Sequence, residues 1–462
     1  MTLIKSISGI RGTIGGQVGD NLTPIDAVKF ASAYGVWIKQ QRDKEHYKVV
    51  VGRDARISGE MIQNLVMNTL VGLGIHVVDL GLSTTPTVEV AVPMEHADGG
   101  IILTASHNPK QWNALKLLNH KGEFLNAVEG AKILEIAESD TMQFAEVDDL
   151  GKITINDAYI EMHIDAVLNL PLVNIEAIKK AKFKVVVDGV NSTGGIAIPR
   201  LLDRLGVYAI ELYCEPTGHF PHNPEPLKEH LTDLSKLVVK KQADFGIVVD
   251  PDVDRLAFVC EDGEMFGEEY TLVACADYVL SRTPGSTVSN MSSSRALRDV
   301  TEKHGQTYEA SAVGEVNVVE LMKSNNAIIG GEGNGGIIYP ELHYGRDSLV
   351  GVALFLSLLA EKSMNISELR NSYPSYFMSK NKIQLTPNLD VDKILLTIQS
   401  RYSKENITTI DGVKIDFKES WVHLRKSNTE PIIRIYTEAK SQVEADELAD
   451  NIITEIKEIA KI

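Results

Sequence analysis

The sequence predicts an α/β fold in which three related units with mixed sheets are followed by a smaller α+β unit. The first observation behind this prediction is a repeated pattern of strand, polar loop, helix, glycine and second strand. It occurs over residues 49–80, 184–213 and 286–309, and in each copy the glycine stands where a helix C-cap is expected. Units of this kind form parallel or mixed sheets that are covered by helices.

The second observation is that the C-terminal part of the chain has a different pattern. Two segments there look helical, and short strands are predicted between them. The segments are helices at Asp390–Tyr402 and Gln442–Ile459 and strands at Val413–Phe417, Trp421–Arg425 and Pro431–Tyr436. We therefore divide the chain into four units, at residues 1–150, 151–258, 259–366 and 367–462.

The charge balance limits the class of partner. The chain has 46 Lys and Arg against 63 Asp and Glu, a formal net charge of −17 that would repel a nucleic acid or an anionic membrane. Apolar residues make up 44% of the chain, enough for several hydrophobic cores. These values indicate a globular enzyme, and if it handles phosphate, its positive groups must be concentrated in one place.

Other signals favour the cytoplasm as the compartment. Cys214, Cys260 and Cys275 are too few for a disulfide framework and do not have the spacing of a metal site. The N-terminal segment lacks the apolar stretch of a signal peptide. The longest nearly apolar run, Leu349–Ala360, is shorter than the roughly 20 residues of a membrane span, so it predicts a buried helix.

Each α/β unit contains a further apolar strand that runs directly into an unusual loop. The three loops are Thr104–Pro109, Asp250–Arg255 and Gly331–Gly336. Ligands of α/β sheets bind at the carboxyl ends of the strands. Three related units that each offer one such loop therefore predict a shared central cleft.

The second loop carries three alternating carboxylates, Asp250, Asp252 and Asp254. Alternate side chains of an extended segment point the same way, so the carboxylates would repel one another or take up protons. A hard divalent cation such as Mg²⁺ relieves this repulsion and keeps coordination positions open for phosphate oxygens. An EF-hand loop is excluded, because Arg255 stands at its sixth position, where glycine is required. A solvated acidic turn remains the alternative.

Ser106 lies in the first loop, in Thr-Ala-Ser-His-Asn-Pro, where its hydroxyl can serve as a nucleophile or phosphoryl carrier. No G-x-S-x-G elbow surrounds it, which weighs against an α/β-hydrolase. The alternative is a Ser/Asn turn capped by His107. Lys116, farther along the chain, is either a proton donor or acceptor with a lowered pKa or a surface lysine.

The third loop formally matches the dinucleotide-binding fingerprint G-x-G-x-x-G. The segment after Gly336 does not begin a helix, so we expect no dinucleotide site. The glycines instead allow a ligand to approach the backbone closely. The adjacent polar pair, Glu332 and Asn334, suits sugar hydroxyls.

Basic residues elsewhere in the chain suggest phosphate binding. The segment from Arg425 to Arg434 combines guanidinium groups with a tight polar turn, and guanidinium groups bind phosphate with two parallel hydrogen bonds. Successive backbone N–H groups in such a turn can form an anion nest. The polar residues of the turn are Ser427, Asn428 and Thr429. Arg11, between two glycines near the N-terminus, is a further candidate for a phosphate contact. Solvated charges are the alternative in both places.

Taken together and in this order, the four loops resemble those of the α-D-phosphohexomutase superfamily over the whole chain. The resemblance implies four domains, the last of TATA-binding-protein-like α+β type. It implies a phosphoserine at Ser106, a phosphate-binding loop at 425–434, and substrate or acid/base roles for Arg11 and Lys116. It further implies a Mg²⁺ ion on Asp250, Asp252, Asp254 and a phosphoserine oxygen, and a sugar-binding loop at Gly331–Gly336. We expect His107, Arg255, Arg425 and Arg434 to converge with them on the cleft.

Several residues depart from the common patterns of the superfamily. Pro251 stands where the metal loop often has glycine, and Ala114 replaces a glycine after the phosphoserine loop. In the sugar loop Asn334 and Gly336 replace a serine and a histidine of many bacterial members. Glu315 stands where phosphomannomutase/phosphoglucomutases often have histidine, and an acidic residue there is more similar to phosphoglucosamine mutases. The pair of loops Asp-Pro-Asp-x-Asp-Arg and Gly-Glu-x-Asn-Gly-Gly resembles the archaeal-type branch of that group.

The implied reaction interconverts hexose 6-phosphate and hexose 1-phosphate through a bisphosphorylated intermediate, with a sugar 1,6-bisphosphate as activator. We expect glucosamine phosphate as the substrate, with Glu315 as a partner for its ammonium group, although Glu315 could instead pair with a lysine or arginine. Glucose or mannose phosphate is the alternative substrate. A metal-dependent phosphatase and a catalytically silent sugar-phosphate sensor are alternatives of other classes. The sequence does not indicate the oligomeric state.

Overall fold

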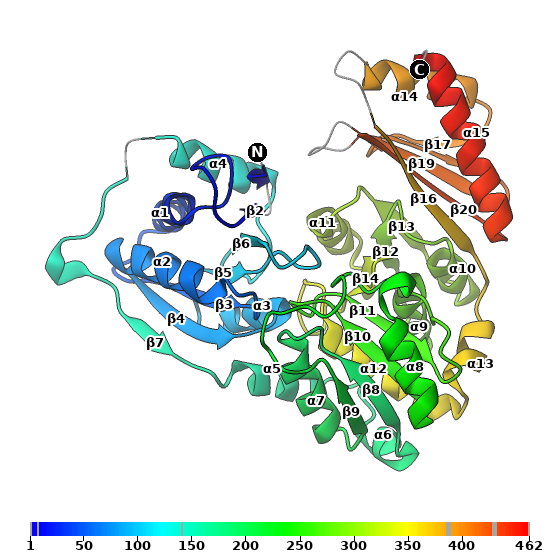
Figure 1. Cartoon of the computed structure of the whole chain (residues 1–462), viewed down its shortest axis with the longest axis horizontal. Helices are drawn as coiled ribbons and strands as arrows, with labels where there is room; N and C mark the ends of the chain where they lie inside the picture. Colours follow the sequence, from blue (N-terminus) through cyan, green and yellow to red (C-terminus); the bar gives the residue numbers. More distant parts are fainter. Residues whose placement is uncertain (1, 7–8, 140–141, 385–389, 427–431, 461–462) are drawn as a thin grey trace.

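Four β-sheets organise the molecule, which we analysed as a computed structural model that describes residues 2–6, 9–139, 142–384, 390–426 and 432–460. The first unit (blue in Figure 1) and the fourth unit (orange to red) lie on either side of the third. The second and third units pack together beneath them. This arrangement confirms the predicted fold class of three α/β units and a C-terminal unit with an antiparallel sheet.

The first sheet has seven strands in the order β1-β2-β6-β5-β3-β4-β7. Strands β3, β4, β5 and β7 run parallel, and β6, β2 and β1 continue the sheet in antiparallel pairs. The strands are β1 (Ile4–Ser6), β2 (Gly9–Thr13), β3 (Tyr47–Arg53), β4 (Ile75–Leu82), β5 (Gly99–Leu103), β6 (Trp112–Leu118) and β7 (Ile153–Ile155).

Helices cover both faces of this sheet. On one face α1, α2 and α4 enclose a core that includes Phe30, Val51 and Ile101, and on the other face α3 packs over Val50 and Ile102. The helices are α1 (Pro24–Gln41), α2 (Gly59–Gly72), α3 (Thr85–Met94) and α4 (Ala127–Ala137), followed by a short 3₁₀ turn at Val147–Asp149. Helix α1 starts with a capping box between Thr23 and Asp26, a strong local start signal.

The second and third sheets have four strands each, three parallel and one antiparallel, in the orders β11-β10-β8-β9 and β13-β12-β14-β15. Their strands are β8 (Lys184–Asp188), β9 (Tyr208–Leu212), β10 (Phe245–Val249), β11 (Leu256–Cys260), β12 (Thr287–Asn290), β13 (Tyr308–Ser311), β14 (Ile329–Glu332) and β15 (Gly336–Ile338). The sheets thus share the mixed pattern of the first.

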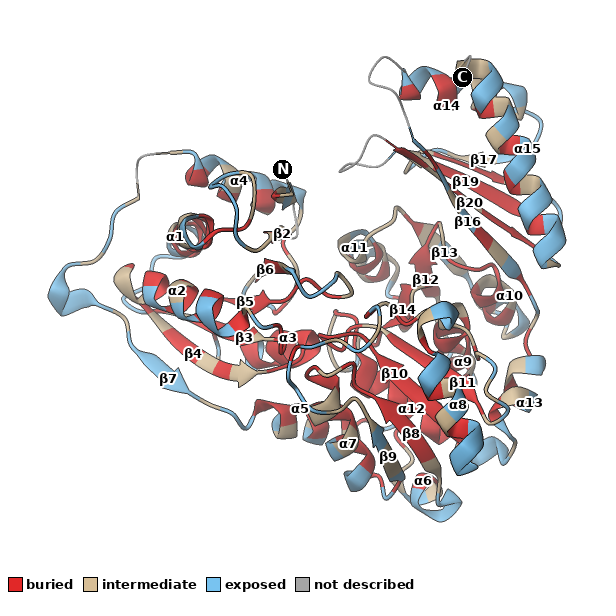
Figure 2. Cartoon of the chain, in the orientation of Figure 1, coloured by how far each residue is buried: buried red, intermediate tan, exposed pale blue. Residues whose placement is uncertain are grey.

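The second and third units share one hydrophobic core. Phe258 of β11 stacks on Phe355 of α12 with ring centroids 3.9 Å apart, and α12 is buried along most of its length, as the apolar run predicted (Figure 2). The helices of the two units are α5 (Tyr159–Leu168), α6 (Ile175–Ala181), α7 (Gly194–Arg204), α8 (Thr232–Lys241), α9 (Glu268–Leu280), α10 (Ala296–Lys303), α11 (Glu315–Asn325) and α12 (Ser348–Lys362), with a 3₁₀ turn at Lys228–His230.

The fourth sheet is entirely antiparallel, in the order β16-β20-β19-β18-β17. Helices α14 and α15 supply Ile398 and Ile452 to a core on one face of this sheet, and α13 (Ile366–Asn371) precedes it. Arg295 of the third unit donates to the carboxylate of Asp416 (3.2 Å) and so ties the third unit to the fourth. The elements are β16 (Phe377–Gln384), β17 (Asn406–Thr408), β18 (Val413–Asp416), β19 (Trp421–Lys426), β20 (Ile432–Ala439), α14 (Val391–Arg401) and α15 (Gln442–Ala460).

The boundaries of the four units stay predictions, and two strands depart from them. Strand β7 lies entirely after residue 150 but belongs to the first sheet, where it is the edge strand beside β4. Strand β11 runs to Cys260, two residues past the predicted end of the second unit at 258. The chain therefore crosses from one sheet to the next slightly later than the sequence pattern suggested.

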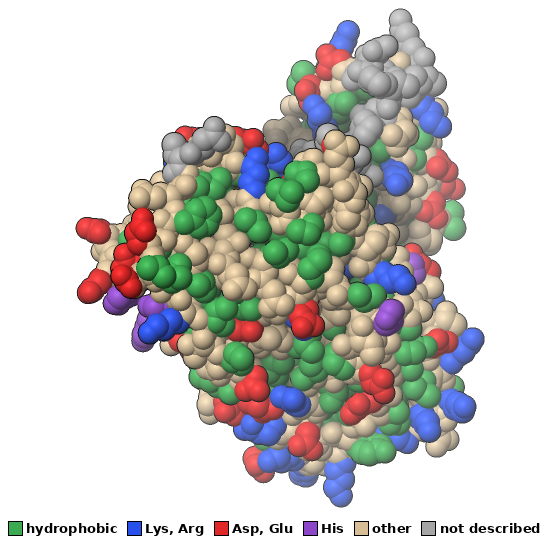
Figure 3. Space-filling model, turned by 60° about the vertical axis from the view of Figure 1, so that its left-hand side comes forward, with side chains coloured by type: hydrophobic (Ala, Val, Ile, Leu, Met, Phe, Trp, Pro, Cys, Tyr) green, Lys and Arg blue, Asp and Glu red, His purple; other side chains and the backbone are tan. Residues whose placement is uncertain are grey.

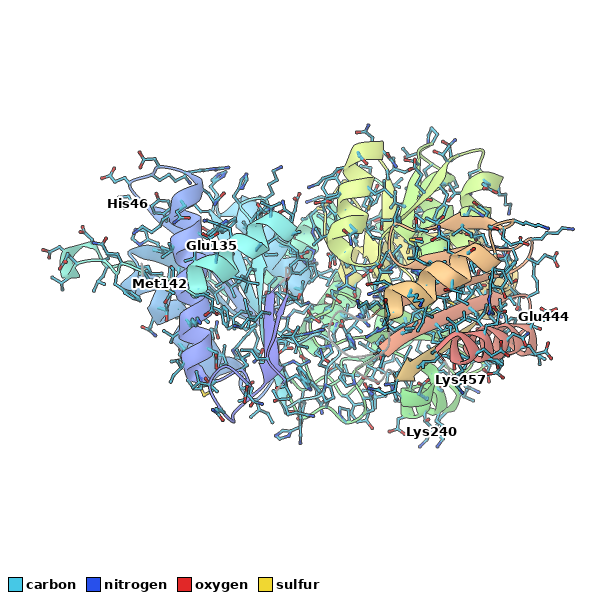
Figure 4. The ribbon with its side chains drawn as sticks, turned by 90° about the horizontal axis from the view of Figure 1, so that it is seen from above. His46, Glu135, Met142, Lys240, Glu444 and Lys457 are labelled. Carbon is cyan, nitrogen blue, oxygen red and sulfur yellow. The ribbon has the colours of Figure 1, made fainter. Side chains whose placement is uncertain are left out.

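Charged side chains of both signs lie on the surface of the molecule. On the face drawn in Figure 3, acidic and basic side chains are interspersed over the lower part of the molecule. Seen from above in Figure 4, the exposed side chains of His46, Lys240 and Glu444 lie near the edges of the molecule. No helix in the described part of the chain is long and apolar enough to cross a membrane.

Candidate active site

The three loops at the carboxyl ends of β5, β10 and β14 meet where the first three units join. Ser106 Oγ of the first unit donates to Asp250 Oδ2 at 2.7 Å. Lys116 Nζ, on β6, lies 2.7 Å from Asp252 Oδ2 and 3.2 Å from Asp254 Oδ2. The backbone N–H of Leu256, directly after the metal loop, donates to Gly335 O of the sugar loop at 3.0 Å. The structure therefore brings these sequence-predicted loops into direct contact.

Ser106 is held in a strained conformation that directs its hydroxyl at the aspartates. Its φ is +50°, in the left-handed region that residues other than glycine seldom adopt. Its N–H donates to Thr104 Oγ1 at 2.9 Å, and the side chain is buried. His107 Nδ1 lies 3.4 Å from Ser106 Oγ, and burial, followed by the charge of Arg255, lowers the pKa of this histidine well below its usual value.

The serine loop is also held by an arginine that sequence reasoning missed. The guanidinium of Arg56 is completely buried and donates to Asn108 O (2.8 Å), Pro109 O (2.8 Å), Trp112 O (3.1 Å) and Ser106 O. Its Nε pairs with Asp54 Oδ2 at 2.9 Å. A single side chain thus supports the backbone from Ser106 to Trp112. The Asp-x-Arg spacing after β3 is the signal that could have drawn attention to it.

The metal loop is a tight buried turn. Asp250 Oδ1 accepts hydrogen bonds from the N–H groups of Asp254 and Arg255, each at 3.1 Å. Val253, a β-branched residue, has a φ of +65°, which is a strained conformation for such a side chain. Ser192 and Thr193 both donate to the carbonyl oxygen of Pro251, at 2.7 and 2.9 Å. These contacts hold the three carboxylates together against their mutual repulsion.

The donor set fits a hard divalent cation. Asp250, Asp252 and Asp254 each offer a carboxylate oxygen, and these atoms lie within 4.8 Å of one another. All three side chains are fully buried, yet Oδ1 of Asp252 and Oδ1 of Asp254 have no hydrogen-bond partner among the described residues. Buried carboxylate oxygens without partners are costly unless a cation binds them. The acidic triad could therefore hold a metal ion, which excludes the solvated acidic turn.

The pKa values of Asp250 and Asp254 are shifted in opposite directions. Burial, reinforced by the charges of Asp252 and Asp254, raises the pKa of Asp250 well above its usual value. Burial alone would also raise the pKa of Asp254, but Arg346, Lys116 and Arg255 lower it. Asp250 is thus the carboxylate that favours binding a proton. Asp254 is kept ionised by three cations, of which Arg346 and Lys116 belong to other units.

The pKa of Lys116 differs from the sequence expectation. From the sequence, Lys116 is expected to be either an acid/base group with a lowered pKa or an exposed surface lysine. In the structure its side chain is largely buried. Its burial alone would lower the pKa, yet the charges of Asp252 and Asp254 raise it. Lys116 is therefore a cation paired with the metal loop.

Arg346 is the second residue that sequence reasoning missed, and it connects the metal and sugar loops. Its Nη2 donates to Asp254 Oδ2 (2.7 Å) and its Nη1 to Glu332 Oε2 (3.1 Å). Glu315 receives both the Nε–H and the backbone N–H of Arg346, at 3.0 and 2.9 Å. Glu315 is thus paired with an arginine, the alternative that the sequence analysis had left open. No sequence motif marked Arg346, because its partners are distant in the chain.

The sugar loop is shaped by this arginine and by close backbone packing. Glu332 Oε1 accepts from Asn290 Nδ2 at 2.7 Å, and Asn334 Oδ1 accepts from the N–H of Gly336 at 3.2 Å. A Cβ atom at Gly336 would lie 2.3 Å from Cδ of Arg346, whose guanidinium is fixed by three carboxylates. This crowding explains why glycine stands where many bacterial members have histidine.

The remaining predicted basic residues come from the first, second and fourth units. Arg11 of β2 has a buried Nε without a hydrogen-bond partner among the described residues, and burial, followed by the charge of Arg434, lowers its pKa. Arg255 pairs with Glu225 at 3.3 Å. Arg425 and Arg434 face each other as a cross-strand pair on β19 and β20, so their side chains share one face of the sheet. The predicted contacts of Ser427, Asn428 and Thr429 lie outside the described residues.

Comparisons with known proteins agree with this architecture. Four phosphoglucomutase/phosphomannomutase family models match in order: alpha/beta/alpha domain I at 3–144, domain II at 161–263, domain III at 267–376 and the C-terminal domain at 385–455. A phosphoglucomutase/phosphomannomutase of Thermococcus kodakarensis is 36% identical over 97% of this chain and 99% of its own. A probable phosphoglucosamine mutase of Methanopyrus kandleri is 32% identical over 96% of both chains.

A solved structure is similar over the whole length as well. The crystal structure of a phosphoglucomutase/phosphomannomutase family protein from Burkholderia thailandensis has a TM-score of 0.85 and 25% sequence identity. The match covers 99% of this chain and 97% of that chain.

The buried arginine beneath the serine loop generates a prediction. Arg56→Lys should leave several carbonyl groups of residues 106–112 unpaired, because an ammonium cannot reproduce the planar fork of a guanidinium. Amide hydrogen exchange in this loop should accelerate at least about tenfold, the equivalent of ~1.4 kcal/mol. Arg53→Lys is the matched control, since Arg53 bonds Gln63 and Asp54 instead. Equal exchange in both variants would mean that Arg56 does not support the loop.

Proposed function

Because the chain belongs to the phosphoglucomutase/phosphomannomutase family of the α-D-phosphohexomutase superfamily, we propose that Ser106 carries the phosphoryl group of a phosphohexomutase reaction. The single observation that supports this role most is the 2.7 Å contact between Ser106 Oγ and Asp250 Oδ2. It places a strained, buried hydroxyl beside an acidic triad that fits a divalent cation. The enzyme is an isomerase that interconverts hexose 6-phosphate and hexose 1-phosphate.

The proposed reaction has two phosphoryl transfers. In the first, the bond between phosphorus and Ser106 Oγ breaks while a bond forms to the free hydroxyl oxygen of the hexose monophosphate, and the proton of that hydroxyl ends on Ser106 Oγ. The resulting bisphosphate reorients, and its other phosphoryl group returns to Ser106 Oγ while the oxygen that it leaves regains a proton. A sugar 1,6-bisphosphate would activate the enzyme by phosphorylating Ser106 in the same way.

The surrounding residues would position and neutralise the transferring group. Asp250, Asp252, Asp254 and an oxygen on Ser106 would hold Mg²⁺, which when bound neutralises charge on the phosphoryl oxygens. Lys116, a buried cation here, would stabilise the same charge and supply a proton to the leaving oxygen. His107, 3.4 Å from Ser106 Oγ, is proposed as a further catalytic residue.

The substrate would be held at both ends. Glu332 and Asn334 are proposed to bind sugar hydroxyls from the loop between β14 and β15. The distal phosphate would meet Arg425, Arg434, Arg11 and Arg255, together with the polar turn of Ser427, Asn428 and Thr429. The influence of Arg434 on the pKa of Arg11 supports this assignment, because two guanidinium groups from different units then share one region.

Replacing the hydroxyl of Ser106 tests the phosphoryl-carrier role. Ser106→Ala should lose nearly all mutase activity while folding normally, because no other group can accept the phosphoryl group at that point. The kcat should be measured with a bisphosphate activator present, and Ser83→Ala, which removes another buried hydroxyl, is the control. Retention of more than about a tenth of the wild-type kcat would exclude the role. Release of inorganic phosphate without isomer formation would favour the phosphatase alternative.

For the sugar we propose glucosamine phosphate, with glucose or mannose phosphate as the alternative. Glu315, Glu332 and Asp254 all pair with Arg346, and Asp254 pairs with Lys116 as well, so three carboxylates lie beside two cations. The remaining negative charge would favour a substrate ammonium. Glu315 would then act through the local charge of the site, since its oxygens already accept from Arg346.

Kinetics on the three sugar 1-phosphates test this choice. The kcat/KM should be highest for glucosamine 1-phosphate, and Glu315→Gln should reduce that preference about tenfold, equivalent to ~1.4 kcal/mol of transition-state stabilisation. Glu320→Gln, on the same helix, is the control. A clear preference of the wild type for glucose or mannose phosphate would refute the glucosamine proposal.

A further inference from the structure

A second cluster of metal-binding side chains lies apart from the aspartate triad, at the junction of three helices. His163 belongs to α5, whereas His343 and Asp347 lie just before α12. Their ligand atoms lie within 4.8 Å of one another. Thr87 and Glu89 of α3 face the cluster from the first unit. None of these residues takes part in the proposed reaction.

The two imidazoles are oriented alike. Nε2 of His163 lies 2.9 Å from Asp347 Oδ2, and Nε2 of His343 lies 3.3 Å from the same oxygen. On the opposite side, Nδ1 of His163 is hydrogen-bonded to Thr87 Oγ1 at 3.0 Å, whereas Nδ1 of His343 lies 3.3 Å from Glu89 Oε2 without forming a hydrogen bond to a described residue. Metal-bound histidines usually have one nitrogen on the ion and the other on a hydroxyl, carbonyl or carboxylate, an arrangement that His163 has and His343 approaches.

Glu89 is the observation that suggests a ligand. Its side chain is 1% exposed, and both of its carboxylate oxygens lack a hydrogen-bond partner among the described residues. In the described ion pairs, Glu89 and Asp347 contact histidines only. Within the described part of the chain, these two buried carboxylates beside two imidazoles therefore form no ion pair with a lysine or arginine. A divalent ion would balance both negative charges, with Glu89 bonded to the N–H of a metal-bound His343.

The position of Asp347 before α12 suits it to act as a metal ligand. Its Oδ1 caps α12 by accepting from the N–H groups of Leu349 and Val350, at 2.8 and 3.4 Å. This contact fixes the carboxylate and leaves Oδ2 for the two histidines. Asp347 also directly follows Arg346, which connects the metal and sugar loops.

We propose that His163, His343 and Asp347 bind a divalent transition-metal ion, for which Zn²⁺ is the best match, and that Thr87 and Glu89 orient the two imidazoles. Two nitrogen ligands and one carboxylate suit Zn²⁺, whereas the all-oxygen triad suits Mg²⁺. The ion joins α3 of the first unit, α5 and the segment before α12. Because Asp347 directly follows Arg346, the ion would fix the backbone segment that positions Arg346 beside Asp254.

Cobalt provides a probe that distinguishes the two sites. Titration of the full-length protein with Co²⁺ in saturating Mg²⁺ should produce the intense visible bands of four-coordinate Co²⁺ bound to nitrogen, and added Zn²⁺ should abolish them. His163→Gln and His343→Gln should lose the bands. Glu89→Gln should keep the bands but weaken the affinity about 10- to 100-fold, because it removes only the partner of a ligand. His304→Gln, which breaks another His–Asp pair (2.7 Å), is the matched control and should behave as wild type.

Two outcomes would overturn the proposal. One is a wild-type protein that shows no visible bands at any Co²⁺ concentration. The other is a set of bands that both histidine variants retain. Zinc-edge anomalous diffraction from wild-type crystals serves if a variant fails to fold, and absence of a peak between His163 and His343 would also contradict the proposal. Because none of these measurements uses turnover, their failure is distinguishable from failure of the proposed mutase function.

Discussion

Three carboxylates in one buried turn are the constraint on which the assembly of this molecule depends. Asp250, Asp252 and Asp254 are fully buried, and burial together with the charges of the other two carboxylates opposes the ionisation of Asp250. Partners from other units offset this cost, namely Ser106 and Lys116 from the first and Arg346 from the third. Packing of the units and formation of the site are therefore one process. The overall charge of −17 is therefore compatible with a local concentration of cations, Lys116 and Arg346, at the site.

Much of the fold could be predicted because its signals are local. Strands such as Phe245–Val249 appear as short apolar runs, and the glycine at each helix end marks the repeat. The structure adds elements that the pattern analysis did not specify, including α1 and β16. Strand β16 (Phe377–Gln384) alternates polar and apolar residues only weakly, and its long pairing with β20 stabilises it instead. Tertiary pairing of this kind is not visible in a local window.

The site was predicted less completely, because its charges interact across units. The loops around Ser106, Asp250 and Glu332 were found from composition and spacing, and the structure places them together. Arg346 and Arg56 were missed, because each has partners tens of residues away in the chain. The lowered pKa considered for Lys116 was wrong for the same reason, since the two aspartates that raise it belong to another unit.

Anomalous diffraction from crystals grown with Mn²⁺ in place of Mg²⁺ tests the central claim most directly. The account predicts an ion bound by oxygens of Asp250, Asp252 and Asp254 and by an oxygen on Ser106, at close to the roughly 2.1 Å expected for a hard divalent ion. Lys116 should then move away from Asp252 toward the space beside Ser106. An ion bound elsewhere, or an empty triad with Lys116 still paired to Asp252 and Asp254, would contradict the account.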